Sequence, residues 1–219
     1  VFLSTEAWLK MIDAPVAPIV GAVFVYGASF IIGLTLYNLV ENLLPQSFHQ
    51  LGFDYLKTLT ICVYPFGHVI MWKYYGGTGF LCGMVPIMVL TILALPKGEG
   101  TPVIIWTKYF RGIVPLWQCL LKTAIQVAAG LAAYKLGIFL YQSEIHEHFT
   151  LKLQDNEAGV CNSALKVPLL QGLVVEALGL VYDAWFSTFQ LSQNKVIDTL
   201  LKVTNTGIIV VTGIGFIYF

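Results

Sequence analysis

Side chains that could carry chemistry are sparse in this sequence, and two of them are acids inside otherwise apolar stretches. Asp54 lies near the start of a stretch that runs from 51 to 72, and Glu176 lies in one that runs from 165 to 189. An ionisable side chain inside a membrane span is costly and is usually functional or paired. We therefore expect the two acids to be structural carboxylates. The alternative is that they snorkel or form ion pairs, with Lys57 or a loop lysine as the partner.

A short segment between two apolar stretches has the residue types of a helix start. Thr101 can act as the N-cap residue and Pro102 fits the first helical position, with Gly100 before them and Val103 after. Ten residues of helix rise only about 15 Å, which is half a bilayer. Residues 101–111 therefore predict either a half-helix beside a wet cavity, whose N-terminus would repel cations and orient water, or a surface helix between two spans.

One cluster combines histidines and acids: Glu144, His146, Glu147 and His148. These types can bind zinc or copper, but two histidines two residues apart in a polar loop define no four-ligand geometry, so we expect a solvated loop. His68 could titrate in a pore or serve as a hydrogen-bonded packing group. No Ser/His/Asp or Cys/His spacing and no phosphate-binding loop is present. We expect no catalytic residue, no metal and no cofactor.

Composition places these side chains in a membrane. Hydrophobic residues make up 57% of the chain and charged residues only 11%, whereas about 25% are charged in a soluble domain. Twelve basic residues balance twelve acidic ones, so the basic excess of a nucleic-acid-binding protein is missing. At about 20 residues per helix, the chain has room for six or seven spans and no separate soluble domain. We predict one all-α, polytopic membrane domain over residues 1–219.

Six largely apolar stretches are expected to span the bilayer. We interpret the first as a retained span, because the apolar core of a signal peptide is only about 7 to 15 residues long. The alanines and glycine of the fourth suit close helix packing. The predicted spans are residues 14–40, 51–72, 80–96, 113–141, 165–189 and 203–219.

Charge in the connecting segments predicts the orientation. Residues 97–111 hold three basic residues and one acid, whereas 142–163 hold one lysine and four acids. Because basic residues collect on the cytoplasmic side, we expect the first segment to face the cytoplasm and the second to face outward or into a lumen.

Several motifs, spread over nearly the whole chain, carry a resemblance to a known family: Phe53-Asp54-Tyr55-Leu56-Lys57-Thr58, Thr101-Pro102-Val103, Leu121-Lys122, Gln126-Val127-Ala128, Ser143-Glu144-Ile145-His146, Cys161-Asn162-Ser163-Ala164-Leu165-Lys166 and Val175-Glu176-Ala177. With them the sequence resembles the unorthodox superaquaporin branch of the aquaporin, or major intrinsic protein, family. The first motif looks like the start of the family's first core helix. Thr101-Pro102-Val103 stands where that branch has a variant Asn-Pro-Ala box.

The resemblance implies a right-handed helix bundle with a re-entrant half-helix and an inverted repeat. The extra N-terminal span would be 1–42, the first repeat 51–141, and the second, incomplete repeat 164–219. Asp54 and Glu176 would accept hydrogen bonds from the loops that support half-helices. Leu81 would lie near the constriction of a pore. The family further implies a homotetramer in a lipid bilayer that passes water, glycerol or other small neutral solutes, in the endoplasmic reticulum or another intracellular membrane.

Two departures from the family pattern keep other functions open. Thr101 replaces the family asparagine and lacks the two amide donors. At the spacing of the two acids, a second Pro box would fall beyond Phe219, so we expect a chain truncated before a second half-helix, a last span and the filter arginine. One alternative is a non-conducting membrane scaffold or intracellular-membrane homeostasis protein of the same fold, and another is an ion-coupled transporter that uses Asp54 and Glu176.

Overall fold

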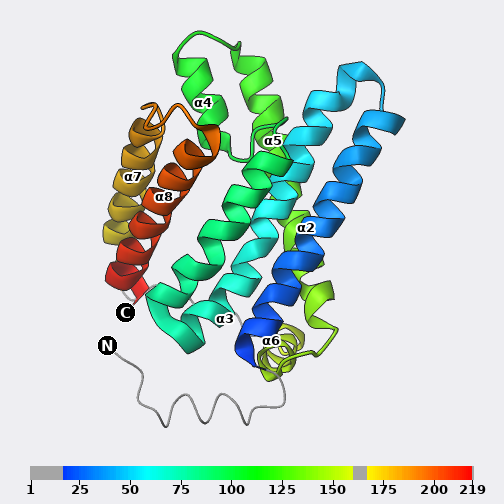
Figure 1. Ribbon diagram of the computed structural model, residues 1–219, viewed down its shortest axis with the longest axis vertical. Coiled ribbons are helices and arrows are strands. Elements are labelled where there is room, and N and C mark those ends of the chain that lie inside the picture. Colours follow the sequence, from blue (N-terminus) through cyan, green and yellow to red (C-terminus); the bar gives the residue numbers. More distant parts are fainter. Residues whose placement is uncertain (1–16, 160–166, 219) are drawn as a thin grey trace.

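The computed structural model describes residues 17–159 and 167–218, and all regular structure in these ranges is helical (Figure 1). The motif from Cys161 to Lys166, the first residues of the predicted spans 14–40 and 165–189, and the last residue of the span 203–219 lie outside the described residues. Helices α2, α3, α5, α7 and α8 are long and apolar enough to cross a membrane, so the all-α, multi-pass prediction is confirmed. The helices are α2 (Pro18–Leu43), α3 (Gln46–Ala94), α4 (Pro102–Phe110), α5 (Leu116–Tyr141), α6 (Glu147–Glu157), α7 (Leu169–Phe186) and α8 (Lys195–Tyr218).

Helix α3 contains two predicted spans, because the chain reverses within it. Gly76 has φ 64° and ψ −159°, a conformation that a residue without Cβ adopts readily. The first arm of α3 (residues 46–75) and the second arm (77–94) lie side by side. The hydroxyls of Tyr64 and Thr91 are 2.6 Å apart, although a straight helix would separate them by about 40 Å. Five membrane-length helices therefore account for all six predicted stretches.

The polar segment 142–163, predicted as a loop, contains a helix. The ring of His146 accepts a hydrogen bond from the backbone N–H of His148 at 3.1 Å, which caps the first turn of α6. Phe149 is fully buried against the bundle. A cap and one apolar anchor thus turn a segment with no spanning hydrophobicity into a short helix at the end of the bundle.

Helix α8 also begins earlier than predicted, at Lys195 rather than at residue 203. The Asn194 side chain accepts a hydrogen bond from the backbone N–H of Val196 at 2.9 Å. Lys202 and Asp198 form an ion pair one turn apart at 2.7 Å. Charges that look like a loop in the sequence are therefore paired on the first turns of a helix.

The core lies among α2, the first arm of α3, and α5. Ala129, Ala133 and Gly137 are buried at four-residue intervals on one face of α5, and the ring of Phe66 would lie 2.4 Å from a Cβ added at Gly137. Gly67 of α3 similarly receives the ring of Tyr26 from α2. The small residues expected to allow close helix packing do so at these positions.

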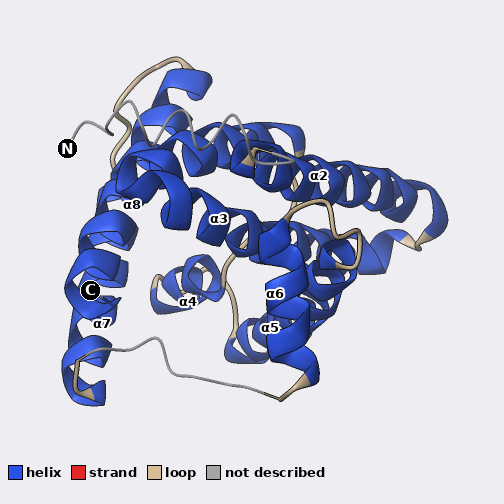
Figure 2. Cartoon of the chain, turned by 90° about the horizontal axis from the view of Figure 1, so that it is seen from below, coloured by secondary structure: helices blue, strands red, loops and turns tan. Residues whose placement is uncertain are grey.

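Helices α7 and α8 form a second, thinner region. Among the described residues of α7 only Gly172 is buried, and α7 packs mainly on α8. Helix α8 in turn packs on the second arm of α3, where a Cβ added at Gly207 would lie 2.7 Å from Leu81 Cδ2. Seen from below, α4 lies between α3, α5 and the α7–α8 pair (Figure 2).

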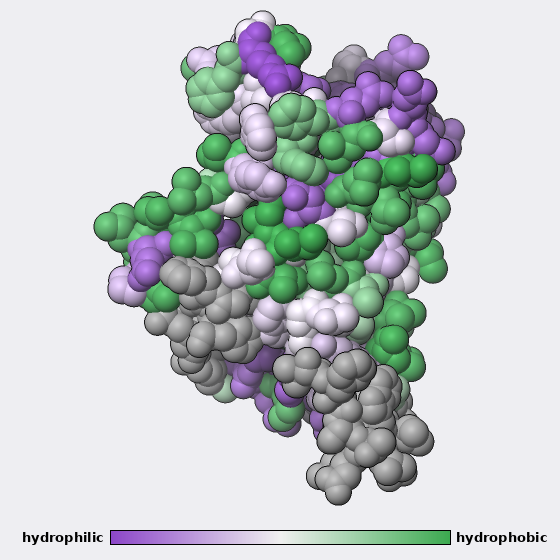
Figure 3. All heavy atoms as spheres, turned by 60° about the vertical axis from the view of Figure 1, so that its left-hand side comes forward, coloured by the Kyte–Doolittle hydropathy of each residue, from purple (hydrophilic) through white to green (hydrophobic). Residues whose placement is uncertain are grey.

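Large apolar side chains are exposed on the outer sides of several helices. On the face that carries α7 and α8, hydrophobic side chains cover much of the central part and hydrophilic side chains gather at the upper edge (Figure 3). Large apolar side chains such as Leu131, Leu173 and Val181 are more than half exposed. This distribution is typical of helices that face lipid.

Candidate functional site

The predicted half-helix begins where the sequence placed it. Thr101 is the N-cap residue in an extended conformation, Pro102 opens α4, and the helix ends at Phe110. The Thr101 hydroxyl makes no capping hydrogen bond, and the residue is exposed. Helix α4 is therefore positioned by the loop that precedes it rather than by its own cap.

Asp54 fixes that loop. Its carboxylate is completely buried, and Oδ1 accepts hydrogen bonds from the backbone N–H of Glu99 at 2.7 Å and from Gln50 Nε2 at 3.1 Å. Lys122 of α5 places its Nζ 3.4 Å from Oδ2. The backbone contact expected for Asp54 is thus present, but its ion-pair partner is Lys122 and not Lys57 or a loop lysine.

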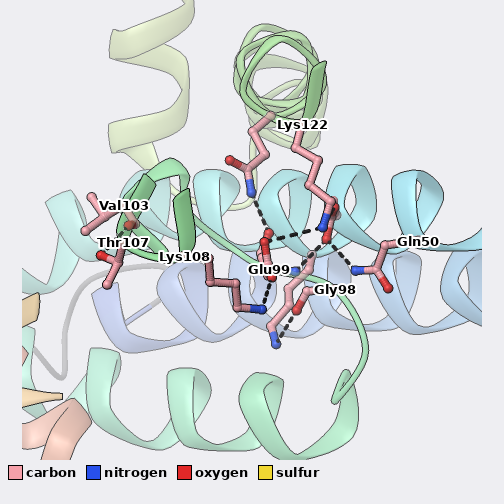
Figure 4. Close-up of polar contacts among 10 residues, drawn as sticks. Gln50, Gly98, Glu99, Val103, Thr107, Lys108 and Lys122 are labelled. Carbon is pink, nitrogen blue, oxygen red and sulfur yellow. Dashed lines mark hydrogen bonds and ion pairs between the residues drawn. The ribbon is translucent and has the colours of Figure 1, made fainter. Parts of the chain in front are cut away.

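Glu99 is the second acid of this network. Its side chain forms ion pairs with Lys108 of α4 and with Lys122, the latter at 3.5 Å, and these lysines reach it from two directions (Figure 4). Its backbone carbonyl accepts a hydrogen bond from Gln126 Nε2 at 2.6 Å. Two carboxylates and two lysines leave the network close to electrical neutrality.

The neighbouring backbone of the loop is held just as closely. Lys57 Nζ donates to the carbonyl of Gly98, and the Thr58 hydroxyl donates to the carbonyl of Gly100, both at 3.2 Å. Gly98 has φ 85°, and a Cβ there would lie 2.6 Å from the backbone carbonyl of Phe53. Only glycine fits this position, because any side chain would strain the backbone and strike the helix.

The network holds the loop before α4 in place and pairs its own charges; it does not supply a reactive group. Asp54 Oδ2, Glu99 Oε2 and Gln126 Oε1 are buried acceptors without a hydrogen bond, but the two carboxylate oxygens face the Lys122 ammonium. No hydroxyl or thiol of a described residue is activated by a base here. The arrangement fixes the backbone that leads into α4 and orients that helix.

Glu176 lies apart from this network. It is exposed on α7, and it makes no hydrogen bond to any residue that the structure describes. With Asp183 and Thr206 it borders an open groove of about 390 Å³ between α7 and α8, in which the Thr206 hydroxyl donates to Asp183 at 2.6 Å. The loop contact predicted for Glu176 is not formed within residues 17–159 and 167–218.

Leu81, the predicted constriction residue, packs on Gly207 of α8. It lies just after the reversal of α3, and the helix from there to Ala94 rises about 20 Å before the loop to α4 begins. Val103, by contrast, lies in the first turn of α4 and is half buried. A pore constriction formed by both Leu81 and Val103 would have to extend along the bundle. The constriction at Leu81 therefore stays a prediction.

The histidine cluster is not the solvated loop that the sequence predicted. His146 and His148 are buried at the start of α6, because Phe149 draws this turn onto the bundle. Burial lowers the pKa of both histidines, and the charge of Lys73 lowers both further; for His148, on which Lys152 also acts, the pKa falls to about 4. The described residues hold no group of three or more His, Cys, Asp or Glu side chains placed to share a metal ion.

His68 has the environment of a packing group. Its Nδ1 lies 2.6 Å from the hydroxyl of Tyr26, and the ring of Phe80 stands 5.0 Å from its own. It therefore links α2 to both arms of α3.

The sequence pattern assigned no role to several members of the site, namely Gln50, Glu99, Lys108, Lys122 and Gln126. One signal was available: Lys122 and Gln126 stand four residues apart within a predicted span and so share one helix face. Polar side chains on the inner face of a span require partners. Which partners they meet depends on how α5 is placed against α3, which the sequence does not state.

Over residues 17–159 and 167–218, fold and site together define a helical protein with five membrane-length helices, in which a buried ion network holds the loop before a short helix. No protein-family model matches the chain, and comparison with curated proteins and with solved structures gives no match either. The aquaporin resemblance therefore rests on the residues quoted above.

Proposed function

We propose that this protein is a passive membrane channel of aquaporin type for water, and for glycerol or other small neutral solutes. The observation that supports it best is the hydrogen bond from the Glu99 N–H to the buried Asp54 carboxylate, because it fixes the chain just before α4. The N-terminus of that helix carries a partial positive charge. Placed beside a pore at Thr101-Pro102-Val103, it would repel cations and orient water.

The pairing of charges favours a neutral solute over an ion. Lys122 faces both Asp54 and Glu99, and Lys108 pairs with Glu99, so no member of the network is left to bind and release a cation. Glu176 lies in the groove between α7 and α8, where no residue of the Asp54 network contributes. An ion-coupled transporter that uses both acids therefore has less support than a passive channel.

In this proposal the remaining features follow the family. The α3–α4–α5 segment is the first repeat of a right-handed bundle, and α7 with α8 belongs to the second, inverted one. The protein is a homotetramer in an intracellular membrane. Because Thr101 lacks the amide donors of asparagine, orientation of water is weaker and proton exclusion is less strict than in the family pattern.

Stopped-flow shrinkage of liposomes that contain the purified protein tests the channel. We expect water permeability above that of empty vesicles, and a clear decrease in Val103→Trp, which adds bulk at the first turn of α4. Leu131→Trp is the matched control, since Leu131 is 70% exposed on the surface of α5 and a tryptophan there should leave permeability unchanged. Permeability to water and glycerol equal to that of empty vesicles would contradict the proposal.

A non-conducting scaffold of the same fold is the second candidate. The observation in its favour is the set of rings that fills the space between α2 and the two arms of α3, namely Tyr26, Tyr64, His68 and Phe80. In this case permeability would stay at the level of empty vesicles while Asp54→Ala still destabilised the fold. The two measurements together separate the candidates.

A further inference from the structure

A second cavity lies at the opposite end of the bundle from α4. It is bordered by the first arm of α3, by α5 and by the polar helix α6, and it has a volume of about 690 Å³, within the range of small-molecule sites. The side toward the bundle is apolar: Phe66 and Val69 come from α3, and Ile138 from α5. Val69 is 48% exposed, so the cavity is open to the surroundings of the helices.

The α6 side of this cavity carries an unsatisfied polar group. His148 borders the cavity and is only 3% exposed, yet its Nε2 has no hydrogen-bond partner. Its backbone N–H is already engaged with His146, so that contact does not satisfy the ring. A buried ring nitrogen without a partner is unfavourable unless a molecule in the cavity supplies a hydroxyl or a similar group.

The charges around the cavity are already paired. The two charged residues that border it, Lys152 and Asp155, form an ion pair with each other at 2.9 Å. Burial keeps the His148 ring neutral near pH 7. A charged headgroup would have to compete with this ion pair, whereas an uncharged hydroxyl could bond to the unpartnered ring nitrogen and leave the ion pair intact.

The position of the cavity fits a lipid better than a water-soluble metabolite. Helix α6 is polar and lies across the end of the bundle, whereas the α3 and α5 walls belong to membrane-length helices. Tyr134, at the rim, is half exposed and donates its hydroxyl to Asn156 at 2.6 Å, an amphipathic placement typical of the membrane interface. One side of the cavity thus faces acyl chains and the other faces headgroups.

We propose that this cavity binds an uncharged lipid that carries a hydroxyl group, with its apolar body against Phe66, Val69 and Ile138 and its hydroxyl on His148 Nε2. The chemistry is shared by sterols and by diacylglycerols. The proposal is independent of solute conduction, because the cavity includes no residue of α4 or of the loop before it.

Photo-crosslinking in phosphatidylcholine nanodiscs tests the site. The probes are a diazirine sterol and a diazirine diacylglycerol, each used with its free hydroxyl and as its methyl ether, and labelled peptides are located by mass spectrometry. We expect saturable labelling of peptides from 65–69 and 134–156, and a preference of about fivefold to tenfold for the free hydroxyl, the worth of one hydrogen bond. The hydroxyl probe that saturates at lower concentration identifies the lipid class.

Two variants separate the site from general lipid contact. Val69→Trp fills the cavity and should abolish saturable labelling, whereas Leu131→Trp, on another exposed part of α5, should not change it. His148→Phe keeps the bulk of the ring and should erase the preference for the hydroxyl over the methyl ether. The thermal midpoint of each variant without probe verifies that it is folded. Labelling that is unsaturable, spread over all lipid-facing helices or unchanged in Val69→Trp would overturn the proposal, as would an equal preference in wild type and His148→Phe.

Discussion

Two acids of the same kind, each within a membrane-length helix, have opposite surroundings in this protein. Asp54 lies in the region 17–159, is completely buried, and receives a backbone N–H, an amide and an ammonium group. Glu176 lies in the α7–α8 region, is exposed, and has no hydrogen bond within the described residues. Burial of a carboxylate requires several donors from separate elements, and only the first region brings such elements together.

The packing of the two regions explains the difference. In the first region α2, the first arm of α3 and α5 each contact the loop before α4, through Tyr37, Asp54 and Gln126, and small residues let the helices approach. In the second, α7 and α8 pack mainly as a pair on one arm of α3. A loop can be held at a defined place only by the first kind of packing, so the functional geometry is expected to depend on Asp54 far more than on Glu176.

The largest effect should come from Asp54→Ala. Removing one partner of a buried ion pair typically costs about 3–5 kcal/mol, because the other charge stays buried. We expect about 3 kcal/mol here, since Lys122 keeps Glu99 as a partner. Unfolding in mixed micelles measures the change. Glu176→Ala is the matched control and should alter stability by less than about 0.5 kcal/mol. Equal effects of the two variants would contradict the prediction that Asp54 contributes more to stability than Glu176.

Gly98→Ala should be next. The backbone at Gly98 is left-handed and a Cβ would strike the Phe53 carbonyl, so we expect a loss of about 2–3 kcal/mol, part of it the roughly 1–2 kcal/mol of left-handed strain. Gly112 has φ 70° but nothing within 4 Å of an added Cβ. Gly112→Ala should therefore show the strain alone. If both variants unfold at the same denaturant concentration, the close contact with α3 is not what fixes the loop.

The junction between the two regions can be tested at Gly207. An added methyl group would meet the Leu81 side chain, and we expect Gly207→Ala to cost about 1 kcal/mol, the lower end for overpacking. Leu81→Ala in the same chain should remove that penalty, which a double-mutant cycle would reveal as coupling. Gly213→Ala, where an added Cβ meets nothing within 4 Å, is the control. Strict additivity of Gly207→Ala and Leu81→Ala would show that this contact does not join the regions.

The most local effect should be a pH dependence confined to α6. The folded pKa of His148, about 4, lies below its ordinary 6.5, so between these values the unfolded chain binds the extra proton. Stability is therefore complete above pH 6.5 and falls as the pH drops toward 4. Hydrogen exchange of α6 should accelerate over this window while α7 and α8 do not respond. His148→Gln should flatten the response; a persisting pH dependence would assign it to another group.

Local patterns predicted the elements well where one force dominates. Long apolar stretches became membrane-length helices because the hydrophobic pattern leaves few alternatives, and the Thr101-Pro102 start was readable because both residues have strong positional preferences. The predictions were wrong where a few weak interactions decide the local structure. The polar segment with His146 folds into a helix through one cap and one buried phenylalanine, a combination that composition does not reveal.

The sequence by itself determined the membrane class of the protein, two separate apolar stretches at 51–72 and 80–96 with glycines between them, the position of α4 and the candidate role of Asp54. Each of these follows from local chemistry, namely apolar length, a residue without Cβ, a proline at a helix start, and a charge in an apolar stretch. Only the tertiary structure decided that Lys122 and Gln126 complete the Asp54 site, that Glu176 does not take part, and that His148 borders a cavity. These depend on how separate helices are placed against one another, because hydrogen bonds and ion pairs act over a few ångströms and connect residues far apart in the chain.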